Sequence, residues 1–299
     1  MSLAHDERDN LYPGHLGCSG CGEVIGLKLV LQAVGKRAIA VVIPGCIGII
    51  IGPYPFSTFK IPFFHTAFET AGATAAGISN ALLAKGDEET VVVALAGDGG
   101  TADIGIQSLS GAADRDENFI YCCFDNEAYM NTGIQVSSAT PQLAWTMTTP
   151  LGKAGRKKNM VEIMAAHRIP YVATACACFP EDLRRKITEA KKIKGTKYIH
   201  ILSPCPTGWR FPERLTPNIG RLAVETRYFP LYEIRNGRDV RITHKPKDLP
   251  IEDYLSAQGR FKHLAKDEVD KIKKEIDKNW DELTRREGQS PTLEQEASR

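Results

Sequence analysis

Five short apolar runs, rich in β-branched residues, recur along the first two thirds of the chain. Each run is almost continuously apolar rather than alternating, which predicts strands that are buried on both faces of a sheet. We expect these strands at 38–43, 90–96, 119–124, 171–175 and 198–202. Apolar or small residues at helical spacing predict helices over 20–34, 67–84, 104–113, 159–167 and 181–193. The alternation predicts an α/β fold, a doubly wound and mainly parallel sheet.

The pattern changes after residue 220. Asn236-Gly237 lies at the centre of the segment 232–243 and is typical of the tight turn of a β-hairpin. The segment 266–286 predicts a heavily charged helix with few apolar positions, which we expect to cover a neighbour or face solvent. We therefore divide the chain into an α/β domain, 1–220, and a C-terminal hairpin and helical extension, 221–299.

Composition narrows the classes of function. The chain has 299 residues, 42% of them apolar, and a formal net charge of +2. With no basic stripe or stacking platform, this charge argues against a nucleic-acid partner. No apolar run approaches the roughly 20 residues that span a bilayer, and the start lacks the pattern of a signal peptide. We expect a cytoplasmic protein without a membrane partner, in which the eight cysteines serve metals or catalysis rather than disulfides.

Polar or thiol residues follow four of the predicted strands. Cys46 comes after the first strand, Gly97–Gly100 after the second, Asp125-Asn126 after the third and Cys205 after the last. In open α/β sheets, ligands bind outside the carboxyl ends of the strands. One edge of the sheet is therefore predicted to carry the functional site.

The segment Gly97-Asp98-Gly99-Gly100 ends a strand and opens a helix, where backbone N–H groups can bind a phosphate. Asp98 suits such a site if a cation lies between carboxylate and phosphate, and Mg²⁺ is held in this way. A plain Asp-Gly turn is the alternative for this motif alone. Asn126 follows Gly97-Asp98-Gly99 after 26 intervening residues, the spacing of the thiamine-diphosphate motif. In proteins with that motif the aspartate, the asparagine and a carbonyl, here that of Ala128, hold Mg²⁺.

The cysteines fall into two groups. Cys18-Ser19-Gly20-Cys21 precedes a predicted helix and lets two thiolates reach one metal centre, but alone it fits zinc, a redox disulfide or an iron–sulfur cluster. Cys46 and Cys205 lie singly at strand ends near prolines; four thiolates from three such places suit a cubane cluster, whereas structural zinc more often uses two paired motifs. The other four lie in or beside apolar runs and are expected to pack in the core. They are Cys122, Cys123, Cys176 and Cys178.

The segment 125–133, Asp-Asn-Glu-Ala-Tyr-Met-Asn-Thr-Gly, resembles the β subunit of pyruvate:ferredoxin oxidoreductase and its relatives. The resemblance spans about residues 14–260 and is also carried by 14–22, 65–69, 97–105, 139–141, 203–205 and 222–226. It implies a [4Fe–4S] cluster on Cys18, Cys21, Cys46 and Cys205, and Mg²⁺ and thiamine diphosphate at Gly97, Asp98, Gly99, Gly100, Asn126 and Ala128. It also implies that Asn131 lies beside the substrate and the thiazolium ring, and that His65 lies near the active centre.

The activity implied by this resemblance is thiamine-dependent oxidative decarboxylation of a small 2-oxoacid, with single electrons leaving through the cluster to ferredoxin. In this family a separate pyrimidine-binding α subunit supplies the glutamate that faces the aminopyrimidine ring. The ferredoxin-type cysteine run is also missing from this sequence, which implies a further, ferredoxin-like cluster subunit.

Two departures from the pyruvate pattern leave the substrate open. Gln135-Val136 stands where Gln-Arg is common, and Pro44-Gly45-Cys46-Ile47-Gly48 stands where Thr-Gly-Cys-Leu-Glu is common. Both a pyruvate-type enzyme that uses coenzyme A and an oxalate oxidoreductase that needs none are therefore predicted candidates. A non-redox thiamine decarboxylase or synthase would leave the four cysteines unused. A zinc-stapled structural subunit would leave the pairing of Asp98 with Asn126 unexplained, so we prefer the redox interpretation to both.

Overall fold

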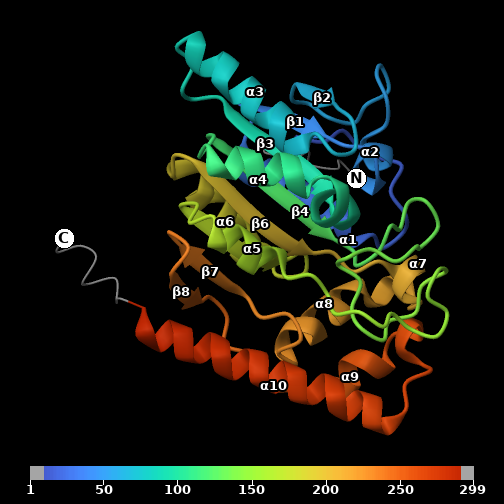
Figure 1. Ribbon diagram of the computed structural model, residues 1–299. Helices are drawn as coiled ribbons and strands as arrows, with labels where there is room; N and C mark the ends of the chain where they lie inside the picture. The colour runs from blue at the N-terminus through green and yellow to red at the C-terminus, as the bar shows by residue number, and fades with distance from the viewer. Residues whose placement is uncertain (1–9, 291–299) are drawn as a thin grey trace, which may run out of the picture.

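A sheet of eight strands forms the centre of the computed structural model, which describes residues 10–290 (Figure 1). The strands lie in the order β2-β1-β3-β4-β6-β5-β7-β8. Their bounds are β1 (Ala38–Val42), β2 (Phe63–His65), β3 (Val91–Gly97), β4 (Phe119–Asp125), β5 (Tyr171–Cys176), β6 (Thr196–Leu202), β7 (Tyr232–Arg235) and β8 (Asp239–Ile242). All five predicted strands are therefore confirmed.

Neighbouring strands are parallel across the part of the sheet with the order β2-β1-β3-β4-β6-β5. The strand β7 pairs antiparallel with β5, and β8 pairs antiparallel with β7. The central strands β3 to β6 are buried almost along their whole length, as their continuous apolar runs predict. The register places Gly97 opposite Phe124 and Asp125 opposite Leu202. The carboxyl ends of β1, β3, β4 and β6 consequently meet at one edge.

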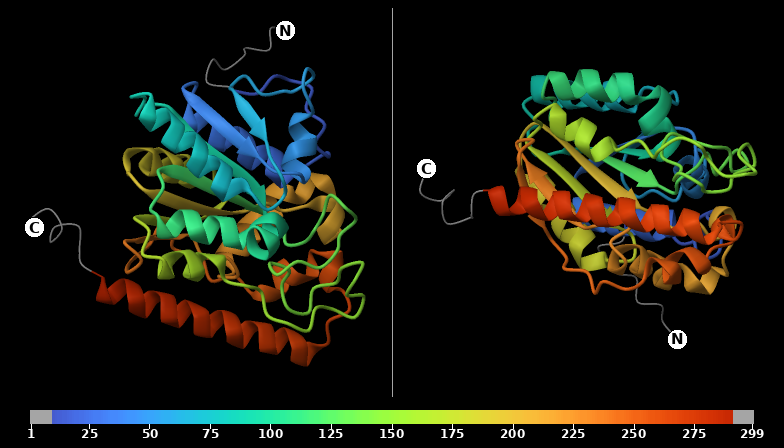
Figure 2. Two further views of the ribbon diagram at one scale, coloured as in Figure 1. Left: turned by 45° about the horizontal axis from the view of Figure 1, so that its top comes forward. Right: turned by 60° about the horizontal axis from the view of Figure 1, so that its bottom comes forward.

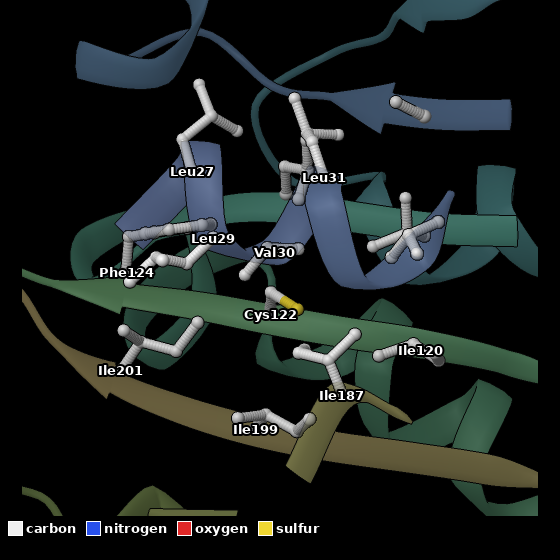
Figure 3. Close-up of a cluster of buried hydrophobic side chains, with 14 of the residues drawn as sticks. Leu27, Leu29, Val30, Leu31, Ile120, Cys122, Phe124, Ile187, Ile199 and Ile201 are labelled. Carbon is white, nitrogen blue, oxygen red and sulfur yellow. The ribbon is translucent and has the colours of Figure 1, made fainter. Parts of the chain in front are cut away.

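Helices cover both faces of the sheet. One face packs against α1 and α6, and Figure 3 shows Val30 of α1 and Ile187 of α6 beside Cys122 of β4. The other face packs against α3, α4 and α5. The bounds of the first six helices are α1 (Gly22–Val34), α2 (Cys46–Ile51), α3 (Ala71–Ala84), α4 (Ile106–Asp114), α5 (Met160–Ala166) and α6 (Pro180–Lys192). The predicted doubly wound α/β fold is confirmed.

The C-terminal part packs onto the same body around a third core that includes Trp209, Tyr254 and Phe261. Its elements are α7 (Pro206–Trp209), the 3-10 turn η2 (Glu213–Leu215), α8 (Thr216–Glu225), α9 (Ile251–Ser256), the 3-10 turn η3 (Gly259–Phe261) and α10 (Lys266–Gln289). Figure 2 shows α10 as one long helix that crosses the molecule beside the hairpin. Only Ile276 and Leu283 of α10 are buried, as its charged sequence predicts.

The predicted hairpin is β7–β8, and it turns at Asn236 and Gly237, which both have positive φ, as a type I′ turn requires. The division after residue 220 falls within α8, and the hairpin extends the sheet of the first part. The sequence did not predict β2 or α2, because three and six residues are too few for a periodic pattern. No helix within residues 10–290 is long and apolar enough to cross a membrane.

Candidate active site

The parallel strands bring the predicted functional residues to one edge of the sheet. Cys46 begins α2 beyond β1, Asp98 follows β3, Asn126 follows β4 and Cys205 lies beyond β6. The Asn126 side-chain nitrogen lies 3.9 Å from Cys46 Sγ, so the thiol set and the oxygen set are in direct contact. The predicted gathering at one edge is confirmed.

The turn after β3 passes directly from strand to helix. Helical backbone begins at Asp98 and continues through the π-helix η1 (Gly100–Ile104). The first N–H groups of a helix have no partner within it, so they are available to a phosphate. Gly99 also meets a packing requirement, because a Cβ at this position would lie 2.3 Å from the Tyr129 ring.

Asp98 is buried at this turn, with 1% of its surface exposed. Ser137 Oγ donates a hydrogen bond to its Oδ2 at 2.6 Å. Burial, followed by repulsion from Asp125, raises the pKa of Asp98 well above its usual range. A divalent cation beside the carboxylate would reverse this shift. The environment of Asp98 therefore fits a Mg²⁺ ligand.

Further oxygen ligands lie in the turn that follows β4. Asn126 Oδ1 accepts the Ala128 N–H at 3.4 Å, so the two residues form one tight turn. Because Gly97 and Phe124 pair in the sheet, this turn and the Asp98 turn leave adjacent strands. A carboxylate, an amide oxygen and a backbone carbonyl form the kind of donor set that Mg²⁺ takes together with phosphate oxygens.

Glu23 is a candidate site residue that the sequence analysis missed. It lies in the first turn of α1, is 2% exposed, and accepts a hydrogen bond from the Asn126 side chain. Its Oε2 is buried and has no hydrogen-bond partner within residues 10–290. Burial is the main cause that raises the pKa of Glu23 to about 8, with Asn126 opposing the shift and Asp125 adding to it. A buried carboxyl with a free oxygen marks a site for a ligand.

The four predicted cluster cysteines come from three elements that pack together. Cys18 and Cys21 flank the turn before α1, and the Gly22 N–H after this turn donates to the Pro204 carbonyl at 3.0 Å, beside Cys205. Cys205 caps α7, where its Sγ accepts the Gly208 N–H at 3.4 Å. Among the residues that the structure describes, no three His, Cys, Asp or Glu side chains converge on a single metal ion.

Three of these thiols favour the protonated form. Burial raises the pKa of Cys21 to about 12 and that of Cys205 to about 11, and it raises the pKa of Cys46 further. Glu23 adds to the shift at each of the three. A redox-active C-x-x-C motif has the opposite property, a lowered thiol pKa. Positive charge from a bound metal centre would instead deprotonate the thiols.

Comparison with known proteins decides the family. The model of the thiamine pyrophosphate enzyme C-terminal TPP-binding domain matches residues 44–201. Pyruvate synthase subunit PorB of Methanothermobacter marburgensis is 51% identical over 283 residues, which are 93% of this chain and 98% of that protein. The chain belongs to the β-subunit family of the 2-oxoacid:ferredoxin oxidoreductases.

Further members of the family are similar to this β subunit over most of its length. Ketoisovalerate oxidoreductase subunit VorB of Pyrococcus abyssi is 47% identical over 287 residues, covering 92% of each chain. The solved 2-oxoglutarate:ferredoxin oxidoreductase from Magnetococcus marinus matches with a TM-score of 0.59 and 28% identity, covering 69% of this chain and 70% of that one. The predicted family resemblance is confirmed.

The resemblance places two further residues, His65 and Asn131, in or near the active site, and the structure shows where each of them lies. His65 ends β2 at the same sheet edge, and its ring packs edge-on against Phe63 at 5.3 Å. It also faces the start of α2, because a Cβ on Gly48 would lie 3.8 Å from its Cε1. Asn131 lies exposed on the turn after Ala128. The catalytic roles of His65 and Asn131 stay predictions.

The remaining four cysteines lie in the interior, as predicted. Cys122 and Cys123 belong to opposite faces of β4, and Cys176 and Cys178 pack under α8 against Gly220 and Thr216. All four are buried. Their role in packing is confirmed.

Proposed function

We propose that this β subunit binds thiamine diphosphate through Mg²⁺, carries a [4Fe–4S] cluster beside it, and oxidatively decarboxylates a small 2-oxoacid with single-electron transfer to ferredoxin. The observation that carries the proposal is the direct contact, at one sheet edge, between the thiol set and the oxygen set. When bound, thiamine diphosphate supplies the carbanion chemistry of decarboxylation. The chain supplies ligands, orientation and charge.

The oxygen ligands support a metal–diphosphate site. Asp98, Asn126 and the Ala128 carbonyl would hold Mg²⁺, and the N–H groups of the Gly97–Gly100 turn would bind the diphosphate. Glu23 lies against Asn126, and its buried Oε2 has no hydrogen-bond partner within residues 10–290, so this oxygen is available to a polar group of the cofactor.

The thiols support a cluster rather than zinc or a disulfide. The thiols lie near enough to act on one another, because Cys205 adds to the raised pKa of Cys21 and of Cys46, and Cys18 adds to that of Cys205. Four thiolates from three separate places suit a [4Fe–4S] cluster, whereas structural zinc more often uses two paired motifs. Four free thiols at a sheet edge also need a reducing compartment, which supports a cytoplasmic location.

The same edge supports a partner subunit. The loop after α2 exposes Tyr54 and Phe56, with 87% and 82% of their surfaces accessible. Leu16, Ile49 and Phe64 are also large, apolar and exposed in the neighbouring segments. Exposed apolar groups of this size mark a protein interface. We assign this surface to the pyrimidine-binding α subunit, which would complete the thiamine site; the ferredoxin-like cluster subunit would take the electrons onward.

The apolar character of α2 supports a substrate with a short apolar side chain. Ile47 is buried and Ile49 is half exposed, on either side of Gly48, at the edge where the substrate would lie. The second carboxylate of oxalate would need a further cation there. We therefore propose that the substrate is pyruvate or a branched 2-oxoacid and that coenzyme A accepts the acyl group. Oxalate is the alternative substrate.

The test is anaerobic purification of this chain together with its partner subunits. Iron, acid-labile sulfide, zinc and thiamine are measured, and electron paramagnetic resonance follows reduction with dithionite. Ferredoxin reduction is then assayed with pyruvate, 2-oxoisovalerate and oxalate. The variant Cys205→Ser is prepared in the same complex, so that the cluster signal which it alters can be assigned to this chain.

We expect about four irons per chain at this site, a reduced-cubane signal that Cys205→Ser alters, and ferredoxin reduction with an apolar 2-oxoacid. A colourless, iron-free complex that still releases CO₂ would indicate the non-redox thiamine enzyme. Zinc without any thiamine dependence would indicate the structural subunit. Activity with oxalate alone would overturn the substrate assignment and leave the rest in place.

A further inference from the structure

Arg260 is a buried cation of the C-terminal extension that lies next to the candidate active site, in contact with Glu127. It belongs to the short turn η3, and 2% of its surface is exposed. Its Nε donates to Gln258 Oε1 at 2.9 Å and its Nη2 to the Tyr254 hydroxyl at 3.3 Å. Its carbonyl accepts the Trp145 N–H at 3.0 Å. Gln258 and Tyr254, which precede Arg260 closely in the chain, thus fix the position of the guanidinium.

The guanidinium contacts the turn after β4 in two ways. Its Nη2 lies 2.6 Å from Glu127 Oε2 as an ion pair, although the N–H is not directed at that oxygen. Its face lies 3.8 Å from the centre of the Trp209 ring, and the Trp209 indole N–H donates to the Asn126 carbonyl at 2.7 Å. Arg260 therefore contacts Glu127 directly and Asn126 through Trp209.

Glu127 needs this support. Its φ is +67°, a left-handed conformation that is unfavourable for a residue other than glycine. Its carbonyl accepts the Thr140 hydroxyl at 2.7 Å, and its N–H donates to Asp125 Oδ1 at 2.9 Å. The left-handed residue sets the direction of the chain between Asn126 and Ala128. The geometry of the two proposed Mg²⁺ ligands thus depends on how firmly Glu127 is held.

Charge balance makes Arg260 hard to replace. Glu23, Asp98, Asp125 and Glu127 are all buried, with at most 2% exposed. Lys157 contacts two of them, at 2.5 Å from Asp125 and 2.6 Å from Glu127. His200 also contacts Asp125, at 2.7 Å, but without Arg260, Glu127 would have to share the Lys157 ammonium with Asp125. A buried carboxylate without full compensation is costly.

We propose that Arg260 is a positioning residue for the cofactor site, which holds the Asn126–Ala128 turn in its Mg²⁺-binding geometry through Glu127 and Trp209. The inference rests on the proposed function, because it requires Mg²⁺ at this turn. Arginine is needed because its flat guanidinium can stack on Trp209 while it pairs with Glu127, and lysine can only supply the charge.

The test measures Mg²⁺-dependent binding of thiamine diphosphate to the complete complex, by protein fluorescence, beside the kinetic constants for the 2-oxoacid. Arg260→Gln should raise the apparent Mg²⁺ dissociation constant about ten-fold or more, as loss of a residue that orients metal ligands does. Arg260→Lys should fall between Arg260→Gln and the unaltered complex. The KM for the 2-oxoacid should change less than about two-fold, because Arg260 touches the metal turn and not the substrate.

Two controls separate positioning from general loss of stability. Ile251→Ala loosens packing in the same C-terminal core and should lower the thermal midpoint while Mg²⁺ affinity stays within about two-fold. Arg210→Gln removes an exposed arginine that stacks on Trp145 at 3.3 Å, and should change neither quantity. If Arg260→Gln does not assemble, the double variant Arg260→Gln with Glu127→Gln removes both charges; it should assemble and still bind Mg²⁺ weakly.

Unaltered Mg²⁺ affinity in Arg260→Gln or in the double variant would overturn the inference. An equal loss of affinity in Ile251→Ala would also overturn it, because general loosening would then explain both. If the unaltered complex binds thiamine diphosphate without any dependence on Mg²⁺, the proposed metal site itself fails, and the inference fails with it. The state of the unaltered complex therefore distinguishes the two failures.

Discussion

Replacement of Lys157 by methionine should destabilise this protein strongly, because it removes one cation from two buried carboxylates. Lys157 Nζ lies 2.5 Å from Asp125 Oδ2 and 2.6 Å from Glu127 Oε1, and both carboxylate side chains have no exposed surface. Burial alone would raise the pKa of Asp125, but Lys157 and His200 outweigh it and hold this pKa below its usual range. The folded state is therefore built around the ionised carboxylate.

At an effective dielectric constant of about 20, each of the two contacts supplies roughly 6–7 kcal/mol of attraction. Most of this offsets the cost of removing three charges from water. The variant keeps that cost for the carboxylates and loses the attraction. Removal of one partner from a buried pair costs about 3–5 kcal/mol, and we expect a loss of this size in the free energy of unfolding. His200 and Arg260, which contact the same two carboxylates, keep the loss from being larger.

The measurement is urea unfolding of the purified chain under reducing conditions, followed by circular dichroism. Lys153→Met is the matched control, because Lys153 Nζ donates to the carbonyls of Ser137, Ser138 and Thr140 and forms no ion pair with a carboxylate within residues 10–290. Its loss should cost about 1–3 kcal/mol. If Lys157→Met destabilises the chain no more than Lys153→Met does, the ionic account of this region is refuted.

The remaining predictions concern the site and one remote lysine. Asp98→Ala should abolish retention of thiamine diphosphate after desalting, whereas Asp103→Ala should retain it; full retention in Asp98→Ala would remove Asp98 from the metal set. Cys205→Ser should lose or convert the reduced-cubane signal without loss of the far-ultraviolet spectrum, whereas Cys122→Ser should leave the signal unchanged; an unaltered signal in Cys205→Ser would exclude Cys205 as a ligand. Burial is the main cause that lowers the pKa of Lys197 to about 7, with Asp116 opposing it and Lys194 adding to it, so the unfolded chain binds more protons between pH 7 and about 10 and stability should rise with pH across this window. Lys197→Met should flatten this rise and stabilise the protein by up to about 4 kcal/mol near pH 6.5 and by little near pH 10. Lys194→Met, which removes an exposed side chain, should change the free energy of unfolding little at either pH. If urea unfolding shows equal effects of Lys197→Met at the two pH values, the lowered pKa of Lys197 is contradicted.

Much of the candidate site could be predicted because its signals are local. Asp98 and Cys46 each follow an apolar run directly, and the carboxyl ends of parallel strands share one edge whatever the details of packing. The prediction for Asn126 combined the motif spacing with the rule that consecutive strands are often neighbours, which β3 and β4 obey.

Glu23 left a weaker local signal that could have been used. Glu23, Gly26, Leu27 and Val30 recur at helical spacing, and all four lie on the buried face of α1. A carboxylate on an otherwise apolar face is unusual and indicates a buried role. The sequence does not reveal its partner, since Asn126 is 103 residues away and reaches Glu23 only across the folded sheet.

The sequence by itself determined the α/β architecture, the edge that carries the site, and the residues that follow each strand, because apolar periodicity and strand ends are local properties of the chain. Only the tertiary structure decided which groups support that edge. Lys157 comes from the long segment after β4, and Arg260 comes from the C-terminal extension, where no sequence pattern indicates that this arginine supports the site. Their role arises because a buried carboxylate such as Glu127 requires a cation from wherever the packed chain can supply one, and that choice depends on contacts between distant segments.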